Sequence, residues 1–192
     1  VGALQNSTTA NHNTAVGRFA LLDNTTGSQN TAVGELALEN NTTASNNTAL
    51  GRNALGANTT GANNTGLGQG SLASNTTASN NVAVGDNALV LNTTGANNVA
   101  VGASALDANT TGQNNTGIGL GALGGTTTGV DNTSLGTNSA NDNTTGVHNV
   151  AVGKDALHQN QTGSYNTVVG SLAMNTVGAT WGGNNTAIGY AA

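Results

Sequence analysis

The chain lacks several residue types on which most globular domains depend. Its 192 residues include no cysteine and no proline, and only 6% are charged and 2% aromatic. The absence of cysteine excludes disulfides and thiolate metal sites. Arg18, Arg52 and Lys154 are the three cations, against eight Asp and Glu. Because so sparse a positive charge does not make a phosphate-binding surface, we expect no nucleic-acid partner.

Long apolar runs are missing as well. No window approaches the roughly 18 apolar residues that a transmembrane helix needs, so membrane insertion is not expected. No signal peptide is visible. Since the chain begins at Val1-Gly2, inside a repeat and without Met, we expect it to be a fragment of a longer fibre.

The most informative feature is a strict period of 17 residues in the glycines. The periodic glycines are Gly17, Gly34, Gly51, Gly68, Gly85, Gly102, Gly119, Gly136, Gly153 and Gly170. Gly2 and Gly189 extend the series, with a two-residue deletion before Gly17 and a two-residue insertion before Gly189. A fixed short period is typical of a solenoid. The sequence therefore predicts a single repeat array over residues 1–192, of about eleven coils, with an irregular last coil at 171–189.

Aligned on this glycine, the repeat reads N-T-A-V-G-x-x-A-L-x-x-N-T-T-G-x-x. Asparagine stands four residues before the glycine, at Asn13, Asn30, Asn47, Asn64, Asn81, Asn98, Asn115, Asn132, Asn149, Asn166 and Asn185. The segments N-T-A-V and N-T-T are rich in β-branched residues and bounded by turn residues, which indicates two short strands per repeat. Asn, Thr and Gly disfavour helix. The expected fold class is all-β, a parallel β-solenoid (β-roll) of 17-residue coils stacked at about 4.8 Å.

In such a stack each residue lies above its equivalent, so each column has one role. We expect the Val/Leu/Ile column, which begins at Val16, and the Leu column, which begins at Leu21, to fill the interior. The Asn column is expected to form a ladder in which each side chain bonds to the one above. The glycine marks a corner that needs φ > 0 or a close backbone approach. Arg18, Glu35 and Arg52 share one column, so opposite charges stack along the axis.

Self-association is expected from the small amount of apolar burial in each coil. Two buried aliphatic side chains offset only part of the entropy lost when 17 residues are ordered. The small-residue column of Ala15, Ala32 and Ala49 is opposite in phase to the Val column. If Val points in, Ala points out, and an Ala stripe beside Thr would let another backbone approach closely. This predicts a homotrimer or lateral filament packing.

The run N-T-A-V-G-x-x-A-L resembles the S-V-A-I-G-x-x-S/A repeat of YadA-like trimeric autotransporter adhesin heads. It is still more similar to the N-T-A-I-G-x-x-A-L-x-x-N-T-T-G arrays of bacterial and phage tail-fibre-like proteins. The resemblance covers roughly Gly2 to Gly189. It implies a left-handed trimeric β-roll, extracellular or at the cell surface, that binds surfaces or holds a tip at a distance.

Signals for chemistry are better explained by the repeat. Gly119 to Gly124 matches G-x-G-x-x-G, but Gly119 is the periodic glycine, so no dinucleotide cofactor is expected. His12 and His148 share a column eight coils apart, and only His158 could join His148, which is too little for zinc. The Asp residues scatter over several columns, unlike a repeating calcium motif. No triad or paired carboxylates stand out. We predict no catalytic, cofactor or metal site, and no enzyme activity.

Trp181 replaces the second Thr of its column, beside the insertion at residues 179–183. We expect either a local bulge that packs over the last coil or the beginning of a tip.

Three functions remain open. The first is a structural or adhesive fibre segment that attaches to a host or abiotic surface. The second is an ice-binding solenoid that uses its uncharged, stacked Thr columns. Because neighbouring side chains on a strand alternate, only one Thr per coil can point outward, joined by the preceding Asn if it is the second Thr. The candidate surface-binding residues are Thr26, Thr43, Thr60, Thr77, Thr94, Thr111, Thr128 and Thr145. The third is a plain intracellular spacer.

Overall fold

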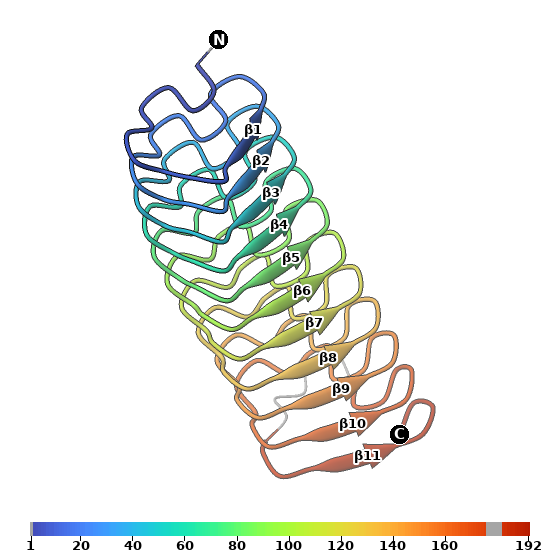
Figure 1. Ribbon diagram of the computed structural model, residues 1–192. Helices are drawn as coiled ribbons and strands as arrows, with labels where there is room; N and C mark the ends of the chain where they lie inside the picture. Colours follow the sequence, from blue (N-terminus) through green and yellow to red (C-terminus); the bar gives the residue numbers. More distant parts are fainter. Residues whose placement is uncertain (1, 176–181) are drawn as a thin grey trace.

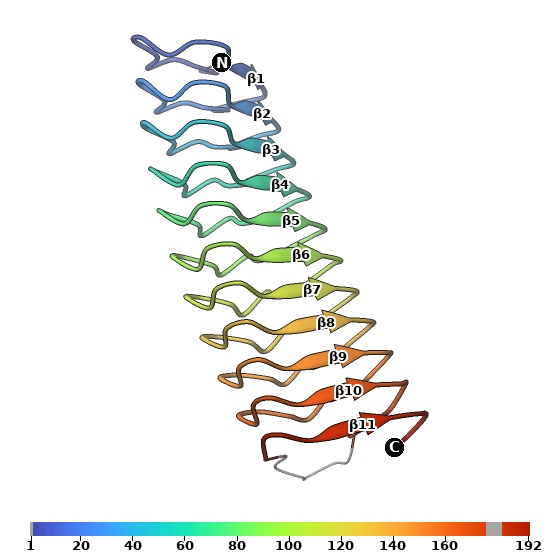
Figure 2. The same cartoon turned by 60° about the horizontal axis from the view of Figure 1, so that its bottom comes forward.

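A computed structural model describes residues 2–175 and 182–192, and these residues form an all-β parallel solenoid without a helix. Its eleven strands are β1 (Thr14–Val16), β2 (Thr31–Val33), β3 (Thr48–Leu50), β4 (Thr65–Leu67), β5 (Val82–Val84), β6 (Val99–Val101), β7 (Thr116–Ile118), β8 (Thr133–Leu135), β9 (Val150–Val152), β10 (Thr167–Val169) and β11 (Thr186–Ile188). The coils stack along one axis with all strands on one side and the two ends of the chain at opposite ends of the stack (Figure 1). Figure 2 shows the coils nearly edge-on, one beside the next along the axis. The expected bulge at Trp181 lies outside the described residues.

The strands form one sheet in chain order and pair in register. Thr14 pairs with Thr31 and Val16 with Val33, a step of one repeat. Thr167 pairs with Thr186, so the same register continues in β11 after the two-residue insertion. The predicted stacking of equivalent residues is therefore confirmed.

Each coil contains one strand, and the prediction of a second strand at N-T-T is wrong. In the segment from Asn24 to Gly27, burial runs buried, partly buried, exposed, buried, which is a period of three rather than two. The backbone explains this pattern, because the N–H groups of Thr25 and Thr26 both donate to the carbonyl of Thr42, at 2.9 and 3.2 Å. A regular parallel ladder does not bring two consecutive amides to one acceptor.

The interior is lined by the Ala and Leu columns, and the expectation that Val points inward is wrong. Ala32 and Leu38 are fully buried, whereas Val16 and Leu50 are 57% and 50% exposed. The middle residue of the strand is small in every strand but β10, where Val168 holds this position and is also fully buried. A Cβ added to Gly66, which holds this position in β4, would face the interior, 3.0 Å from Oγ of Ser71 and 3.5 Å from Cγ of Leu55. The Ala column is thus used inside the coil, so an interface between copies cannot be built on it.

The periodic glycine turns the corner after each strand, as predicted. Gly85 has φ = +138°. A Cβ added there would lie 2.5 Å from the carbonyl oxygen of Gly102 in the next coil. Both the positive φ and the close backbone approach therefore require glycine at this corner.

Candidate functional site

The predicted Asn ladder is a column of buried side chains that bond mainly to backbone. The Oδ1 atom of Asn13 accepts a hydrogen bond from the backbone N–H of Asn30 at 2.8 Å. The Nδ2 group of Asn30 donates to the carbonyl of Ala44 at 2.8 Å rather than to the amide of a neighbouring coil. The same two bonds recur along the column. The bond between amides that the sequence suggested occurs at three positions, where Asn132, Asn166 and Asn185 each donate to the Asn of the preceding coil.

A second buried Asn column, which the sequence analysis did not single out, does form a ladder between side-chain amides. Asn41 Nδ2 donates to Asn24 Oδ1 at 2.8 Å and to Ala44 O at 3.0 Å. Ala44 O thus receives amides from both columns, since Asn30 also donates to it. The Asn that recurs in N-T-T was the sequence signal from which this column could have been found. The buried members of this column are Asn24, Asn41, Asn58, Asn75, Asn92, Asn109, Asn143 and Asn160.

The two Thr columns have different roles. The hydroxyl of Thr25, the first Thr of its pair, donates to the carbonyl of Thr42 in the next coil at 3.0 Å, and this bond repeats along the column. In the first coil Thr8 and Thr9 are both exposed, and in the later Thr-Thr pairs only the second Thr is exposed. The Asn before the pair is buried and does not join it, because the segment has a period of three. After the first coil, the exposed members are Thr26, Thr43, Thr60, Thr77, Thr94, Thr111, Thr128, Thr145 and Thr162.

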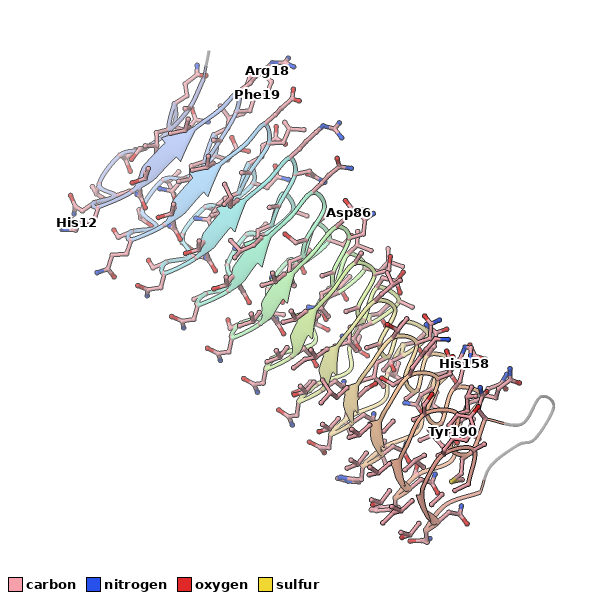
Figure 3. The ribbon with its side chains drawn as sticks, turned by 90° about the vertical axis from the view of Figure 1, so that its right-hand side faces the viewer. His12, Arg18, Phe19, Asp86, His158 and Tyr190 are labelled. Carbon is pink, nitrogen blue, oxygen red and sulfur yellow. The ribbon has the colours of Figure 1, made fainter. Side chains whose placement is uncertain are left out.

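A second exposed column lies three residues further along each coil. It consists of Gln29, Asn46, Asn63, Asn80, Asn97, Asn114, Asp131, His148 and Tyr165. We call this column and the exposed Thr column together the polar strip. His12, the equivalent of Gln29 in the first coil, lies on the opposite side of the molecule from Arg18 and Asp86 (Figure 3).

The outer face of the sheet is uncharged and carries a line of apolar side chains beside a row that is mostly threonine. We call the first and third residues of β1 to β11 the sheet face. The first residue is Thr or Val and the third is Val, Leu or Ile. Among the third residues, Leu50, Leu135 and Ile188 are 50%, 47% and 71% exposed. In β5, β6 and β9 both positions are valine.

Charges gather at the corner that follows the sheet. Glu35 lies between Arg18 and Arg52, with oxygen–nitrogen distances of 3.2 and 3.6 Å, so the predicted stacking of opposite charges is confirmed. All three side chains are exposed, and each pair stabilises the fold by about 0–1 kcal/mol. Elsewhere, partial burial raises the pKa of Asp107 above its ordinary value, against hydrogen bonds that lower it.

The histidines have separate partners. His148 lies 3.8 Å from a carboxylate oxygen of Asp131 and stacks on Tyr165, with ring centroids 4.9 Å apart. His158 lies 3.9 Å from Asp142 and 4.0 Å from Asp155. Over residues 2–175 and 182–192, no group of three His, Cys, Asp or Glu side chains is placed to hold a metal ion.

The G-x-G-x-x-G run lies in the turn after β7. Residues 119–125 are turn and bend, and no helix begins there. A dinucleotide fingerprint needs a helix whose N-terminus meets the pyrophosphate. The run is therefore a corner of the repeat. Within the described part of the chain, no helix is long and apolar enough to cross a membrane.

Comparison with known proteins gives no relative. No protein-family model matches the chain, and neither a curated protein nor a solved structure matches it.

Proposed function

We propose that the chain is a structural and adhesive fibre segment, a rigid extracellular β-solenoid rod that self-associates and presents a surface along its length. The observation that carries this proposal is the sheet face. Apolar side chains that form one continuous line, rather than being scattered singly, are typical of an interaction surface. The sheet face has such a line from Val16 in β1 to Ile188 in β11.

The geometry of the sheet face favours a closed parallel assembly. The sheet face lies on one side of the stack, so copies arranged around an axis parallel to the solenoid can bury it along its whole length. In that arrangement each coil contacts the equivalent coil of the neighbouring copy. The valine coils, with Val82 and Val84 in β5 and Val99 and Val101 in β6, then pack against valine rather than against threonine hydroxyls. The resemblance of the repeat to trimeric adhesin heads favours three copies.

Light scattering of the purified chain tests this proposal. We expect a mass three times the 18.6 kDa of one chain. The double variant Leu50→Lys with Leu135→Lys places charge on the sheet face and is expected to be monomeric. The matched control is Leu91→Lys with Leu120→Lys, because these leucines are 51% and 54% exposed but lie off the sheet face. A monomeric parent chain at every concentration, or dissociation by the control as well, would contradict the proposal.

Ice binding is a second candidate, and the polar strip is the observation that favours it. Its Thr column is exposed, uncharged and in register. The second column of the polar strip, which is Asn from Asn46 to Asn114, runs beside it as a second row. Thermal hysteresis measured on the monomeric Leu50→Lys, Leu135→Lys variant tests this candidate, which predicts a hysteresis gap that Thr60→Lys with Thr77→Lys abolishes. A chain with neither association nor hysteresis would be a spacer.

A further inference from the structure

We propose that the polar strip binds an extended, uncharged polysaccharide that lies along the solenoid axis. This inference rests on the proposed adhesive function and names the class of surface to which the fibre attaches. Three features of the strip carry it: free hydrogen-bonding groups, the absence of charge over most of its length, and an exposed aromatic ring near one end.

The first feature is the set of polar groups that have no hydrogen-bond partner among the described residues. The hydroxyls of Thr60 and Thr77 and the side-chain amides of Asn63 and Asn80 are exposed. None of the four hydrogen-bonds to another described residue, whereas the hydroxyl of Thr59 is bonded to the carbonyl of Thr76. A hydroxyl and an amide both donate and accept, as do the hydroxyls of a sugar. The middle coils thus offer two free polar groups each to such a ligand.

The second feature is the arrangement of these groups. Equivalent groups repeat once per coil, at about 4.8 Å along a straight line. An extended glycan has rings that repeat at a similar spacing, so one chain of sugars can meet several coils in the same way. Each single contact is weak, and many weak contacts on one polymer add up to retention.

The charge selects the kind of polysaccharide. From Thr26 and Gln29 to Thr128, no residue of the polar strip is charged, and Asp131 is the first that is. The whole chain has a formal net charge of −5. A polyanionic glycan is repelled by this charge and finds no row of cations, so the strip fits a neutral one.

The third feature is the ring of Tyr165, near the C-terminal end of the strip. Tyr165 is 57% exposed. Its ring is held by stacking on His148, at 4.9 Å and 22°. His148 in turn lies 3.8 Å from Asp131, which accepts a hydrogen bond from Asn114 Nδ2 at 3.0 Å. An exposed ring in a fixed position offers an apolar face to the C–H groups of a pyranose, and the Asp131 carboxylate accepts hydrogen bonds from its hydroxyls.

Retention on microcrystalline cellulose and on chitin beads tests the proposal, with heparin beads as the polyanion control. We expect the parent chain to be retained on at least one of the two neutral solids and not on heparin. Tyr165→Ala should weaken retention about tenfold. Tyr190→Ala is its matched control, since Tyr190 is 78% exposed and lies off the polar strip; retention of this variant should not change.

A second pair of variants tests the row of hydroxyls. Thr60→Val with Thr77→Val removes two strip hydroxyls and should also weaken retention. Thr31→Val with Thr133→Val removes two exposed hydroxyls of the sheet face and should leave it unchanged. Circular dichroism of all four variants checks that the fold is kept.

The outcomes separate this inference from the fibre proposal. No retention on either neutral solid overturns the inference, and a trimeric mass in the same sample leaves the fibre proposal standing. Retention that the strip variants do not reduce, or equal retention on heparin, overturns the inference as well. Thermal hysteresis without retention overturns it in favour of ice. Retention by a chain that is monomeric supports the inference and contradicts self-association.

Discussion

At the scale of single residues, the chain uses asparagine as a core residue. Most coils bury two asparagines, and the amides of the two meet at one backbone carbonyl, as Asn47 and Asn58 do at Gly61 O, both at 2.9 Å. A buried polar group stabilises the fold only when it is hydrogen-bonded. A shift of register by one residue would leave these amides without partners. The buried amides therefore specify the stacking that the apolar columns alone would specify weakly.

The second buried Asn column has one break between Asn24 and Asn160, at Thr126. As a consequence, Asn109 Oδ1 and Thr126 Oγ1 are buried without a hydrogen-bond partner. We expect Thr126→Asn to raise the free energy of unfolding by about 1–2 kcal/mol, because it supplies a donor to Asn109 and a second amide to the carbonyl of Gly129. Chemical denaturation followed by circular dichroism measures this change.

The control for this prediction is Thr128→Asn, which makes the same change at an exposed position two residues away. It should alter stability by less than about 0.5 kcal/mol. If Thr126→Asn is neutral or destabilising, the side-chain amides of the second buried Asn column do not stabilise the fold as a ladder.

At the scale of the element, each coil depends on turns that place bulky residues in the left-handed region. Leu89 is fully buried and has φ = +53°, and its equivalents in the Leu column are similar. A β-branched residue is disfavoured at such a φ. The two exceptions in this column, Ala140 and Met174, are not β-branched and have φ of +47° and +46°. The Leu column is therefore selected by backbone conformation as well as by volume.

This selection gives a direct comparison between two substitutions of similar volume. Leu89→Met should cost less than about 1.5 kcal/mol, whereas Leu89→Ile should cost about 1–3 kcal/mol more than Leu89→Met, because branching at Cβ strains the turn. The midpoint of urea denaturation for the two variants measures the difference. Equal midpoints would mean that the turn relaxes and that volume alone governs the column.

The strand itself shows which part of the fold could be read from the sequence. The period located every strand to within its own repeat, because β-branched residues next to a corner glycine recur at each turn. The sequence did not show which side chains of the strand point inward. Alternation allows either the Ala or the Val to be buried, and Val is ordinarily the more buried of the two. The buried phase is the one that faces the rest of the coil, as Gly66 faces Leu55 and Ser71, and this is visible only once the coil has closed.

At the scale of the whole molecule, the same limit applies to the candidate surfaces. The exposed Thr column could be anticipated, because only one Thr of each pair has room to point outward. The second column of the polar strip was missed, since its exposure depends on the three-residue period of a segment that is not a strand. The Val, Leu and Ile residues of the sheet face were expected in the interior, because these residues are ordinarily more buried than Ala. Periodicity identifies which residues form a column, but the faces of the molecule follow from how each coil closes.

The array is a one-dimensional stack, so removing one whole repeat should leave every remaining contact in place. Deletion of residues 69–85 joins Gly68 to Asp86 and restores the pattern of glycine, corner and turn. We expect this variant to unfold cooperatively, with a denaturation midpoint close to that of the parent. By contrast, deletion of residues 69–77 leaves only eight residues in place of a 17-residue coil. These eight residues span at most about 28 Å and cannot complete a turn of about 55 Å.

The shorter deletion should therefore separate the coils before it from those after it, and lower the midpoint far more than the longer one. Circular dichroism and urea denaturation of the two variants and the parent measure this. The longer deletion acts as the control for loss of length, because it removes more residues and keeps the register. If the two variants are equally stable, the coils are not held by contact with their equivalents, and the columns on which both candidate surfaces depend do not exist in solution.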